Sequence, residues 1–336
     1  LEFRRVLFRS ISELIEANAS QRDSCIVILG DKDTVEMQDE LNDKIESFKS
    51  TRIVFRSGNS IDASDLAIVS LQTSKSIVVM RPEGEDPDAQ VIKVLLAITK
   101  DPKRRAEPYH IVAEIYDLEN YDVAKLVGGD EVELIPVGDL VARVLAQTCR
   151  QSGLSIVYTE LLDFGGDEIY FKHEPALVGK SFHEALNAYQ QSTVIGLFTP
   201  GQSAKLNPAK ETLIGPQDEL IFIAADDSAI HYDPMSAALF AESEMRTGTV
   251  TQNKPEHTLV LGWNWRTETV VRELDNYVAP GSAITIVAND PAGTTAEKVH
   301  SFTLVNQSVT FQNADTTQRA FLETLPLASY RHIIVM

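Results

Sequence analysis

The strongest constraint on the fold is a repeat within the chain. Residues 53–80 and residues 309–336 align without a gap. In both segments a short β-rich run is followed by a polar turn, an amphipathic stretch and a second apolar run, an order that favours a duplication over a chance match of apolar letters. The aligned apolar pairs are Phe55 with Phe311, Leu66 with Leu322, Leu71 with Leu327, Ile77 with Ile333, Val79 with Val335, and Met80 with Met336.

The segments that precede the repeat extend it upstream. Residues 24–29 and 282–287 are near-continuous β-rich runs, as expected for parallel strands that are covered on both faces. A helical pattern comes before each run, and in the second copy residues 258–261 form a further strand pattern before that helix. Strand, turn, helix and strand in this order open a doubly wound α/β unit. The sequence therefore predicts two Rossmann-like lobes.

The first copy begins differently from the second. Its helix is expected to start near Ile11, and residues 1–10 match neither the strand nor the turn of the second copy, so we interpret them as a cloning or sequencing scar. The second copy stops at Met336, directly after its apolar run, which suggests an internal fragment. The first strand is central in a 3-2-1-4-5 order. We therefore expect a gap in the first sheet, or residues 3–8 in its place, and low independent stability.

A helix expected from Gly138 to Gln151 carries Leu140, Val144 and Leu145 on one stripe, which fits either a crossover helix against a partner subunit or ordinary core. After Gly153 the chain becomes β-rich around one helix, which is expected from Ser181 to Gln190. The expected organisation is a scar at 1–10, a first lobe at 11–150 that lacks its first strand, an α+β subdomain at 151–230, a polar linker at 231–256, and a second lobe at 257–336 truncated after its fourth strand.

Charge and cysteine content exclude several classes of protein. The 336 residues include 30 Lys and Arg against 49 Asp and Glu, and the net charge of −19 would repel a phosphate backbone, which excludes nucleic acid as a partner. Cys25 and Cys149 have no C-x-x-C neighbour, which argues against a disulfide framework and a thiolate zinc site. No uncharged apolar run approaches the about 18 residues needed to cross a bilayer, so we expect a soluble chain.

Several segments, taken in their order along the chain, resemble one known group. They are residues 26–29 with Glu36 and Met37, 56–59, 126–129 with 146–147, 207–208, 218–223, 261–263, 279–282, and the group Leu322, Leu325, Pro326 and Leu327. With the two lobes and the α+β subdomain, this order resembles tandem regulator-of-potassium-conductance (RCK, TrkA-like) proteins, and within them the CASTOR/POLLUX ion-channel family.

The resemblance implies a non-enzymatic gating region on the cytoplasmic face of a membrane. In that family such regions assemble into a homo-oligomeric, tetrameric ring attached to an upstream transmembrane pore. Binding of a ligand or ion rearranges the ring and controls a monovalent cation flux. Such control requires two ring conformations with different ligand affinities, because only differential binding shifts a population.

The loop after the first strand of a Rossmann lobe tests for dinucleotide binding. A G-x-G-x-x-G loop lets backbone amides and a helix N-terminus hold the pyrophosphate. The second copy instead has one glycine and two bulky indoles in residues 262–267, Gly-Trp-Asn-Trp-Arg-Thr. These rings would obstruct a close approach of the backbone, which argues against orthodox NAD binding there.

Acidic residues follow the second strand of each copy, where a ribose-binding acid would lie, although such acids also cap helices or face solvent. Excess carboxylates leave a Ca2+ site or a nucleotide site open, and Asp163, Asp167 and Glu168 are a further acidic group or simply a solvated turn. The candidate ligand residues are Asp31, Asp33, Glu36, Arg56, Gly58, Asn59, Asp62, Gly262, Asn264 and Asp290.

No motif indicates catalysis. The chain has no H-E-x-x-H pair, no G-x-S-x-G elbow and no Cys/His signature. Two alternatives stay open. An NAD(P)-binding Rossmann oxidoreductase would need a glycine-rich loop and a proton-transfer residue, and a free-standing TrkA-like potassium-uptake subunit would associate with a separate pore protein.

Overall fold

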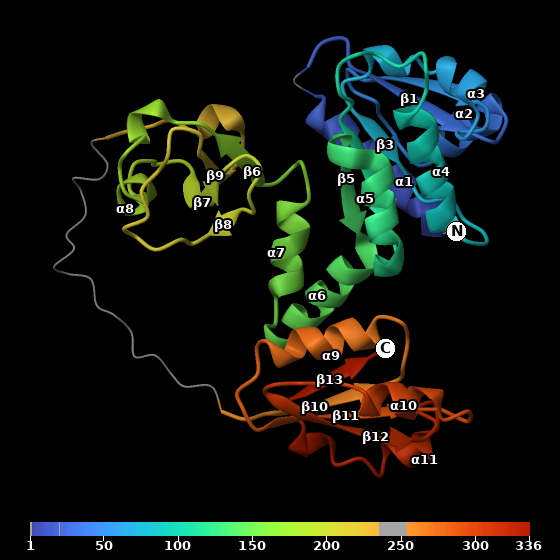
Figure 1. Ribbon diagram of the computed structural model, residues 1–336, viewed down its shortest axis with the longest axis vertical. Coiled ribbons are helices and arrows are strands. Elements are labelled where there is room, and N and C mark those ends of the chain that lie inside the picture. The colour runs from blue at the N-terminus through green and yellow to red at the C-terminus, as the bar shows by residue number, and fades with distance from the viewer. Residues whose placement is uncertain (1, 20, 235–253) are drawn as a thin grey trace. The chain divides into compact units, whose positions relative to one another are not determined.

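The computed structural model describes residues 2–19, 21–234 and 254–336 (Figure 1). The chain divides into two compact units. One comprises residues 1–154 and 252–336, and the other comprises residues 155–251. Most of the expected linker, residues 235–253, lies outside the described residues. Throughout the described residues, each helix is too short or too polar to span a membrane.

The first lobe (residues 2–136) has an α/β architecture in which all strand pairs are parallel. One sheet has the order β1-β2 and the other the order β3-β4-β5. The helices are α1 (Glu2–Ala17), α2 (Thr34–Asn42), α3 (Ala63–Ala67), α4 (Pro87–Thr99) and α5 (Tyr121–Gly128), and the strands are β1 (Cys25–Gly30), β2 (Arg52–Ser57), β3 (Ile77–Val79), β4 (Ile111–Ile115) and β5 (Val132–Pro136).

The two sheets of the first lobe are not hydrogen-bonded to each other. The sequence predicts either such a gap or a strand formed by residues 3–8. The second alternative is wrong, because Glu2–Ala17 form a single helix that starts well before Ile11. Leu7 and Phe8 pack with Ile11 against β1 and β2, at the spacing that one helical face provides.

The second lobe (residues 254–336) has one continuous parallel sheet with the order β12-β11-β10-β13. The predicted succession of strand, turn, helix and strand is present, and the two lobes confirm the α/β class. The strands are β10 (His257–Leu261), β11 (Ser282–Ala288), β12 (Gln307–Asn313) and β13 (His332–Val335), and the helices are α9 (Thr267–Asp275), α10 (Thr294–His300) and α11 (Arg319–Leu322).

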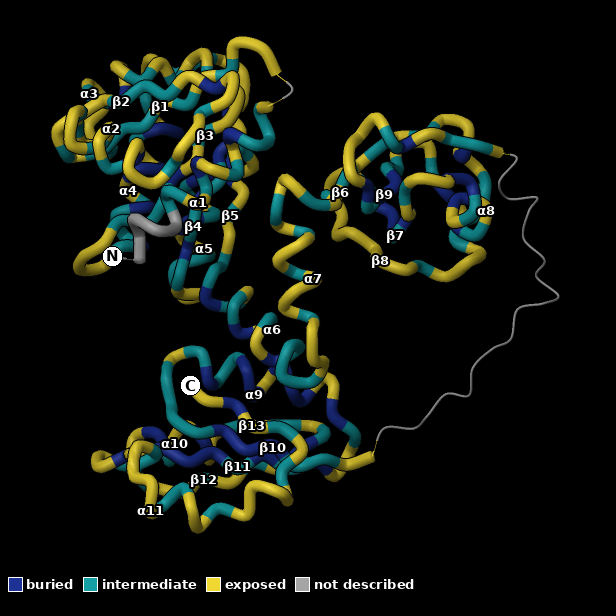
Figure 2. The backbone as a smooth tube through the Cα atoms, turned by 180° about the vertical axis from the view of Figure 1, so that it is seen from behind, coloured by how far each residue is buried: buried dark blue, intermediate teal, exposed yellow. Residues whose placement is uncertain are grey.

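Burial differs between equivalent strands of the two lobes. Ile284 and Ile286 of β11 are completely buried, whereas the matching residues of β1 are only half-buried. Figure 2 shows the same contrast in colour between the β1–β2 region and β10–β11. The strand β10, which lies between β11 and β13, supplies the additional cover.

Helix α6 (Val137–Arg150) follows β5 directly but packs into the second lobe, against α9. Ala142 and Ala146 are completely buried with Val270 and Val271 of α9, so their small side chains let the two helices approach closely. Leu140 and Leu145, from the stripe that the sequence emphasised, are exposed. The buried stripe of α6 is therefore built from small residues, which the spacing of large apolar residues does not reveal.

The unit formed by residues 155–251 contains an antiparallel sheet with the order β6-β9-β7-β8 around a core that includes Phe182 and Phe222. The predicted helix from Ser181 to Gln190 is shorter, and it begins with a capping box between Ser181 and Glu184. The sequence analysis does not predict α7. The elements are α7 (Leu154–Leu161), β6 (Glu168–Lys172), α8 (Phe182–Leu186), β7 (Thr193–Phe198), β8 (Lys205–Leu206) and β9 (Glu219–Ala224).

Candidate functional site

The carboxyl ends of β1 and β2 form one edge of the first lobe. The amide of Gly58 donates a hydrogen bond to the carbonyl of Gly30 over 2.8 Å, so the segments that follow the two strands start side by side. In α/β sheets, ligands bind at such carboxyl edges. The structure therefore brings Asp31 and Asn59 to the same edge, as their sequence positions predict.

Two of the candidate acids at this edge cap helices. The Asp33 carboxylate accepts the amide of Val35 over 2.8 Å at the start of α2. The Asp62 carboxylate accepts both the hydroxyl and the amide of Ser64 at the start of α3. These two hydrogen bonds, the hydroxyl first, lower the pKa of Asp62. Both carboxylates therefore stabilise helix N-termini.

The other first-lobe candidates are more accessible. Asp31 is exposed, and the carboxylate of Glu36 lies 3.2 Å from Lys32 Nζ. The exposed Arg56 donates from Nη1 to the carbonyl of Phe55, its own neighbour, over 2.9 Å. The edge thus offers an exposed carboxylate and an exposed guanidinium.

Gly58 and Asn59 shape the turn after β2. A Cβ on Gly58 would lie 2.9 Å from the side chain of Asp65, so the position needs a glycine. The Asp65 carboxylate accepts the amide of Asn59 over 2.7 Å, and Asn59 Oδ1 accepts the amide of Ile61 over 3.0 Å. Both candidates therefore fix the backbone of the turn that borders the edge.

The expected acidic groups do not assemble into a metal centre in the part of the chain that the structure describes. Within residues 2–19, 21–234 and 254–336, no three His, Cys, Asp or Glu side chains lie close enough together to hold an ion. Glu168 begins β6; burial raises its pKa, a hydrogen bond with Tyr170 lowers it in part, and the charge of Asp226 raises it.

The turn after β10 is closed by its own groups. Gly262 has a φ of +99°, and a Cβ there would lie 2.8 Å from the carbonyl oxygen of Met336. The amide of Asn264 donates to Thr267 Oγ1 over 2.9 Å, and Asn264 Oδ1 accepts the amide of Arg266 over 2.9 Å. These contacts use the donors and acceptors of the turn that a bound phosphate would otherwise meet.

The two indoles of this turn occupy different surroundings. Trp263 stacks on Phe302 inside the second lobe, with ring centroids 6.3 Å apart. Trp265 contacts the first lobe, where its ring centroid lies 4.3 Å from that of Tyr116. From the sequence, both rings are predicted only to obstruct a bound dinucleotide. No spacing pattern connects Trp265 with Tyr116. That contact is found only in three dimensions.

Asp290, the candidate ribose-binding acid of the second lobe, caps α10. Its carboxylate accepts the amide of Ala296 over 2.9 Å, and Asn313 exchanges hydrogen bonds with its backbone over 2.9 and 3.0 Å. Burial raises the pKa of Asp290, but hydrogen bonds from the amides of Ala296, Thr295 and Gly293 outweigh it and lower the pKa. Of the two roles that its sequence position allows, Asp290 therefore stabilises the start of a helix in this structure.

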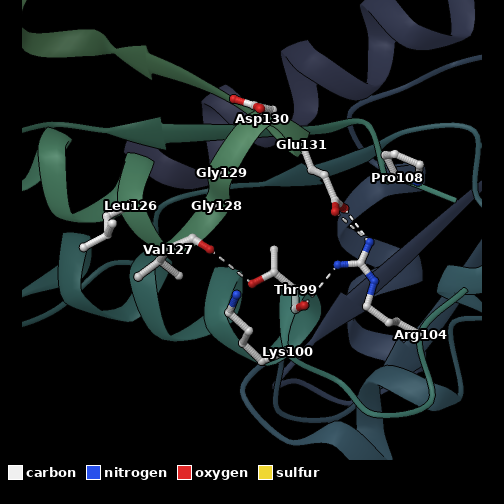
Figure 3. A pocket seen from close by; sticks show the side chains of 10 residues that line it. All are labelled: Thr99, Lys100, Arg104, Pro108, Leu126, Val127, Gly128, Gly129, Asp130 and Glu131. Carbon is white, nitrogen blue, oxygen red and sulfur yellow. Dashed lines mark hydrogen bonds and ion pairs between the residues drawn. The ribbon is translucent and has the colours of Figure 1, made fainter. Parts of the chain in front are cut away.

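A cavity of about 440 Å³ lies where α4 and α5 end (Figure 3). Its polar groups are bound to one another: Arg104 pairs with Glu131 over 2.6 and 2.8 Å and donates to the carbonyl of Thr99 over 3.0 Å. From the sequence, only the end of a helix at Gly128 and Gly129 is predicted here. The lining residues are Thr99, Lys100, Arg104, Pro108, Leu126, Val127, Gly128, Gly129, Asp130 and Glu131.

Comparisons with known proteins agree with this architecture. A family model described as "Castor and Pollux, part of voltage-gated ion channel" matches residues 138–239. The "Probable ion channel CASTOR" of Oryza sativa subsp. japonica is 30% identical over 97% of this chain and 37% of its own length. The "Ion channel CASTOR" of Lotus japonicus is 28% identical over 97% and 39%, respectively. The chain thus spans less than two fifths of these relatives.

A solved structure matches the fold over nearly the whole chain. The structure of the human SLO3 gating ring is similar with a TM-score of 0.62, over 95% of this chain and 65% of that chain, at 16% identity. At this identity the match concerns the fold alone, and it agrees with the expected fold class of Rossmann-like α/β lobes. The family model and the plant relatives together show that the chain is similar to the CASTOR/POLLUX ion-channel family, and the similarity to the relatives extends over nearly its whole length.

Proposed function

We propose that this chain is the regulatory region of a cation channel and acts on a pore at the cytoplasmic face of a membrane. The observation that carries the proposal is the alignment of 97% of the chain with relatives named ion channels. The similarity to a gating-ring fold supports it. In this proposal the chain controls a monovalent cation flux and catalyses no reaction.

Helix α6 supplies the mechanical part of the proposal. It continues from β5 of the first lobe and is buried in the second lobe through Ala142 and Ala146. Arg143 adds an ion pair with the buried Glu273 over 2.9 Å, and Arg150 pairs with Glu256. A rotation of the first lobe therefore pulls on a helix that is packed into the second lobe. Binding of a ligand to the first lobe would in this way change the angle between the two lobes.

The carboxyl edge of β1 and β2 is the candidate ligand site. Asp31 and Arg56 are exposed there beside the turn that Asn59 fixes. The carboxylate would attract a cation such as Ca2+, and the guanidinium would attract a nucleotide phosphate; calorimetry with Ca2+, ATP and NAD distinguishes the two. Asp31→Asn should weaken a cation, and Arg56→Met should weaken a phosphate. Ligand heats unchanged in both variants would place the site elsewhere.

Assembly into a homo-oligomeric ring would explain exposed apolar side chains on two packed helices. Leu96 of α4 and Val123 of α5 are half-exposed, and Leu126 of α5 is 84% exposed. Apolar groups of this size on adjoining helices are typical of an interface. Light scattering of the chain should give an oligomer that Leu126→Glu dissociates, while Leu162→Glu, at another exposed leucine outside α4 and α5, should not.

The test of function is a chimaeric channel. This chain replaces the aligned segment of the Lotus japonicus CASTOR channel, and currents are recorded in a bilayer. We expect ligand-dependent currents in the chimaera and their loss in an Arg143→Met chimaera that still reaches the membrane. Currents identical to those of a channel from which the segment is deleted would contradict a regulatory role.

A further inference from the structure

Tyr116, which follows β4, lies close to two guanidinium groups. Arg81 Cζ lies 4.5 Å from the ring centroid, and Arg266 Cζ lies 5.8 Å from it. Arg266 also donates from Nη2 to the Tyr116 hydroxyl over 2.9 Å. Trp265 adds a tilted aromatic contact at 4.3 Å. Tyr116 and Arg81 belong to the first lobe and Trp265 and Arg266 to the second, so the cluster joins the two lobes.

The first-lobe side of this cluster is held rigidly. The buried carboxylate of Asp88 accepts the amides of Tyr116 over 3.1 and 3.2 Å and of Asp117 over 2.9 Å. It also accepts Asn120 Nδ2 over 3.2 Å and lies 3.4 Å from Arg81 Nε. Because one buried carboxylate fixes both the Tyr116 backbone and Arg81, the aromatic ring is preorganised to receive the Trp265–Arg266 turn.

The cluster lies beside the junction of β5 and α6. Gly138, the second residue of α6, has no Cβ, and an added one would lie 2.5 Å from Trp265 Cζ3 and 2.5 Å from the carbonyl of Tyr116. Trp265 therefore packs on the backbone at the point where the first lobe passes into the helix that the second lobe holds. A contact placed at this junction controls the angle between the two lobes.

The contacts at the start and in the middle of α6 differ in kind. Ala142 and Ala146 are completely buried in the core of the second lobe, whereas Trp265 remains 49% exposed. Aromatic and cation–π contacts at such accessible places stabilise by about 0.5–2 kcal/mol each. The α6–α9 contact is therefore lost only when the second lobe unfolds, whereas the Tyr116 cluster can open without unfolding either lobe.

We propose that Tyr116, Trp265 and Arg266 form an openable latch between the lobes, built from the turn that would hold a pyrophosphate in a dinucleotide-binding lobe. When the latch is closed, Trp265 lies on Tyr116 and Gly138 and the lobes keep one angle. When it opens, the lobes rotate about the start of α6. The latch is a property of this chain alone and is tested independently of any pore.

The test uses the full chain and two readouts. Trp263→Phe leaves Trp265 as the single tryptophan, whose emission maximum and iodide quenching report the latch. Dyes on the exposed Cys25 and on Ser308→Cys, in a Cys149→Ala background, report the angle between the lobes by single-molecule energy transfer.

The decisive variants are Tyr116→Leu, which removes the ring, and Arg266→Met, which removes the guanidinium and its hydrogen bond to the Tyr116 hydroxyl. In both variants we expect the emission of Trp265 to shift to the red and to be quenched more strongly by iodide. The distribution of energy-transfer efficiencies should broaden, and the fraction of molecules with an open latch should rise about 5–30-fold. Tyr121→Leu, the same change elsewhere in the first lobe, should resemble the unmodified chain. If one decisive variant fails to fold by circular dichroism, the other decides the question. Unchanged quenching and transfer in the folded variants would overturn the latch.

Discussion

Arg143 Nη1 of α6 lies 2.9 Å from Glu273 Oε2 of α9, a contact that links residues 130 positions apart. Tyr277 donates its hydroxyl to the other oxygen of Glu273 over 2.8 Å, and this hydrogen bond is the first cause that raises the pKa of Tyr277. A hydrogen bond to Asp139 raises the pKa of Arg143 most, and the charge of Glu273 adds to it. The pair ties the small-residue stripe of α6 to the second lobe.

Removing Arg143 should therefore weaken the union of α6 and α9. Glu273 is buried, and Arg143→Met would leave its carboxylate with the Tyr277 hydroxyl as a hydrogen-bond donor but without its cationic partner. An uncompensated buried charge is costly, and we expect a loss of about 1–3 kcal/mol in the free energy of unfolding by urea. Arg272→Met is the matched control, because its pair with Glu268 on α9 is exposed on both sides and should matter by under about 0.5 kcal/mol.

Asp275 should be a stronger determinant of the second lobe. Its buried carboxylate accepts the amides of Val305, Asn306 and Gln307 over 2.7, 2.9 and 3.0 Å, and so fixes the entry into β12. Asp275→Ala leaves three amides without their acceptor. We expect a loss of about 2–4 kcal/mol in urea unfolding.

The control for Asp275 is another carboxylate of the same lobe. Glu323 pairs with Arg319 on the surface of α11, where both side chains are mostly exposed. Glu323→Ala should change the unfolding free energy by under about 0.5 kcal/mol. Equal losses in the two variants would contradict the role assigned to the Asp275 carboxylate.

Stability should fall in acid through Glu131. Burial raises the pKa of this carboxyl, but hydrogen bonds from Arg104 and the Tyr109 amide, together with the charges of Arg104 and Arg105, lower it below its ordinary value. A pKa that is lower in the folded state stabilises above the unfolded value of about 4.3, and this contribution is lost as the pH falls through the folded pKa. The free energy of unfolding in urea should be lower for Glu131→Gln than for the unmodified chain at pH 7. It should also change less in the variant as the pH falls below 5. Glu133→Gln, at an exposed position of the adjoining strand β5, should follow the unmodified chain.

The repeat made the α/β lobes predictable because apolar runs and helical stripes follow local periodicity. The same reasoning misses α6 as a core element of the second lobe. Large residues such as Leu140 dominate a hydrophobic pattern, whereas close helix packing selects small ones such as Ala142. The acids after the strands were placed at the right edges, but a carboxylate that caps a helix and one that binds a ribose have the same sequence position. Asp33 and Asp290 could be assigned only from their hydrogen bonds.

The latch could not be predicted, because its parts become neighbours only in the folded chain. Nothing in the spacing of Tyr116, Gly138 and Trp265 distinguishes them from ordinary core or surface positions. Similarly, α7 was missed since its short apolar stretch fits a strand as well as a helix. Sequence periodicity thus determines elements, and contacts between distant elements need the structure.

The split sheet of the first lobe should be visible in hydrogen exchange. Among the described strands β1 pairs only with β2, so alternate amides of β1 point to an open edge, whereas β10 is paired on both sides by β11 and β13. The half-buried Ile26 and Ile28 provide less cover than Ile284 and Ile286 of the matching strand. We expect β1 and β3 amides to exchange at least about tenfold faster than those of β10 and β11, since less free energy opposes local opening. Mass spectrometry of the full chain compares both lobes in one sample, so solvent and temperature cancel. Equal protection of β1 and β11 would mean that the open edge of β1 is covered in solution.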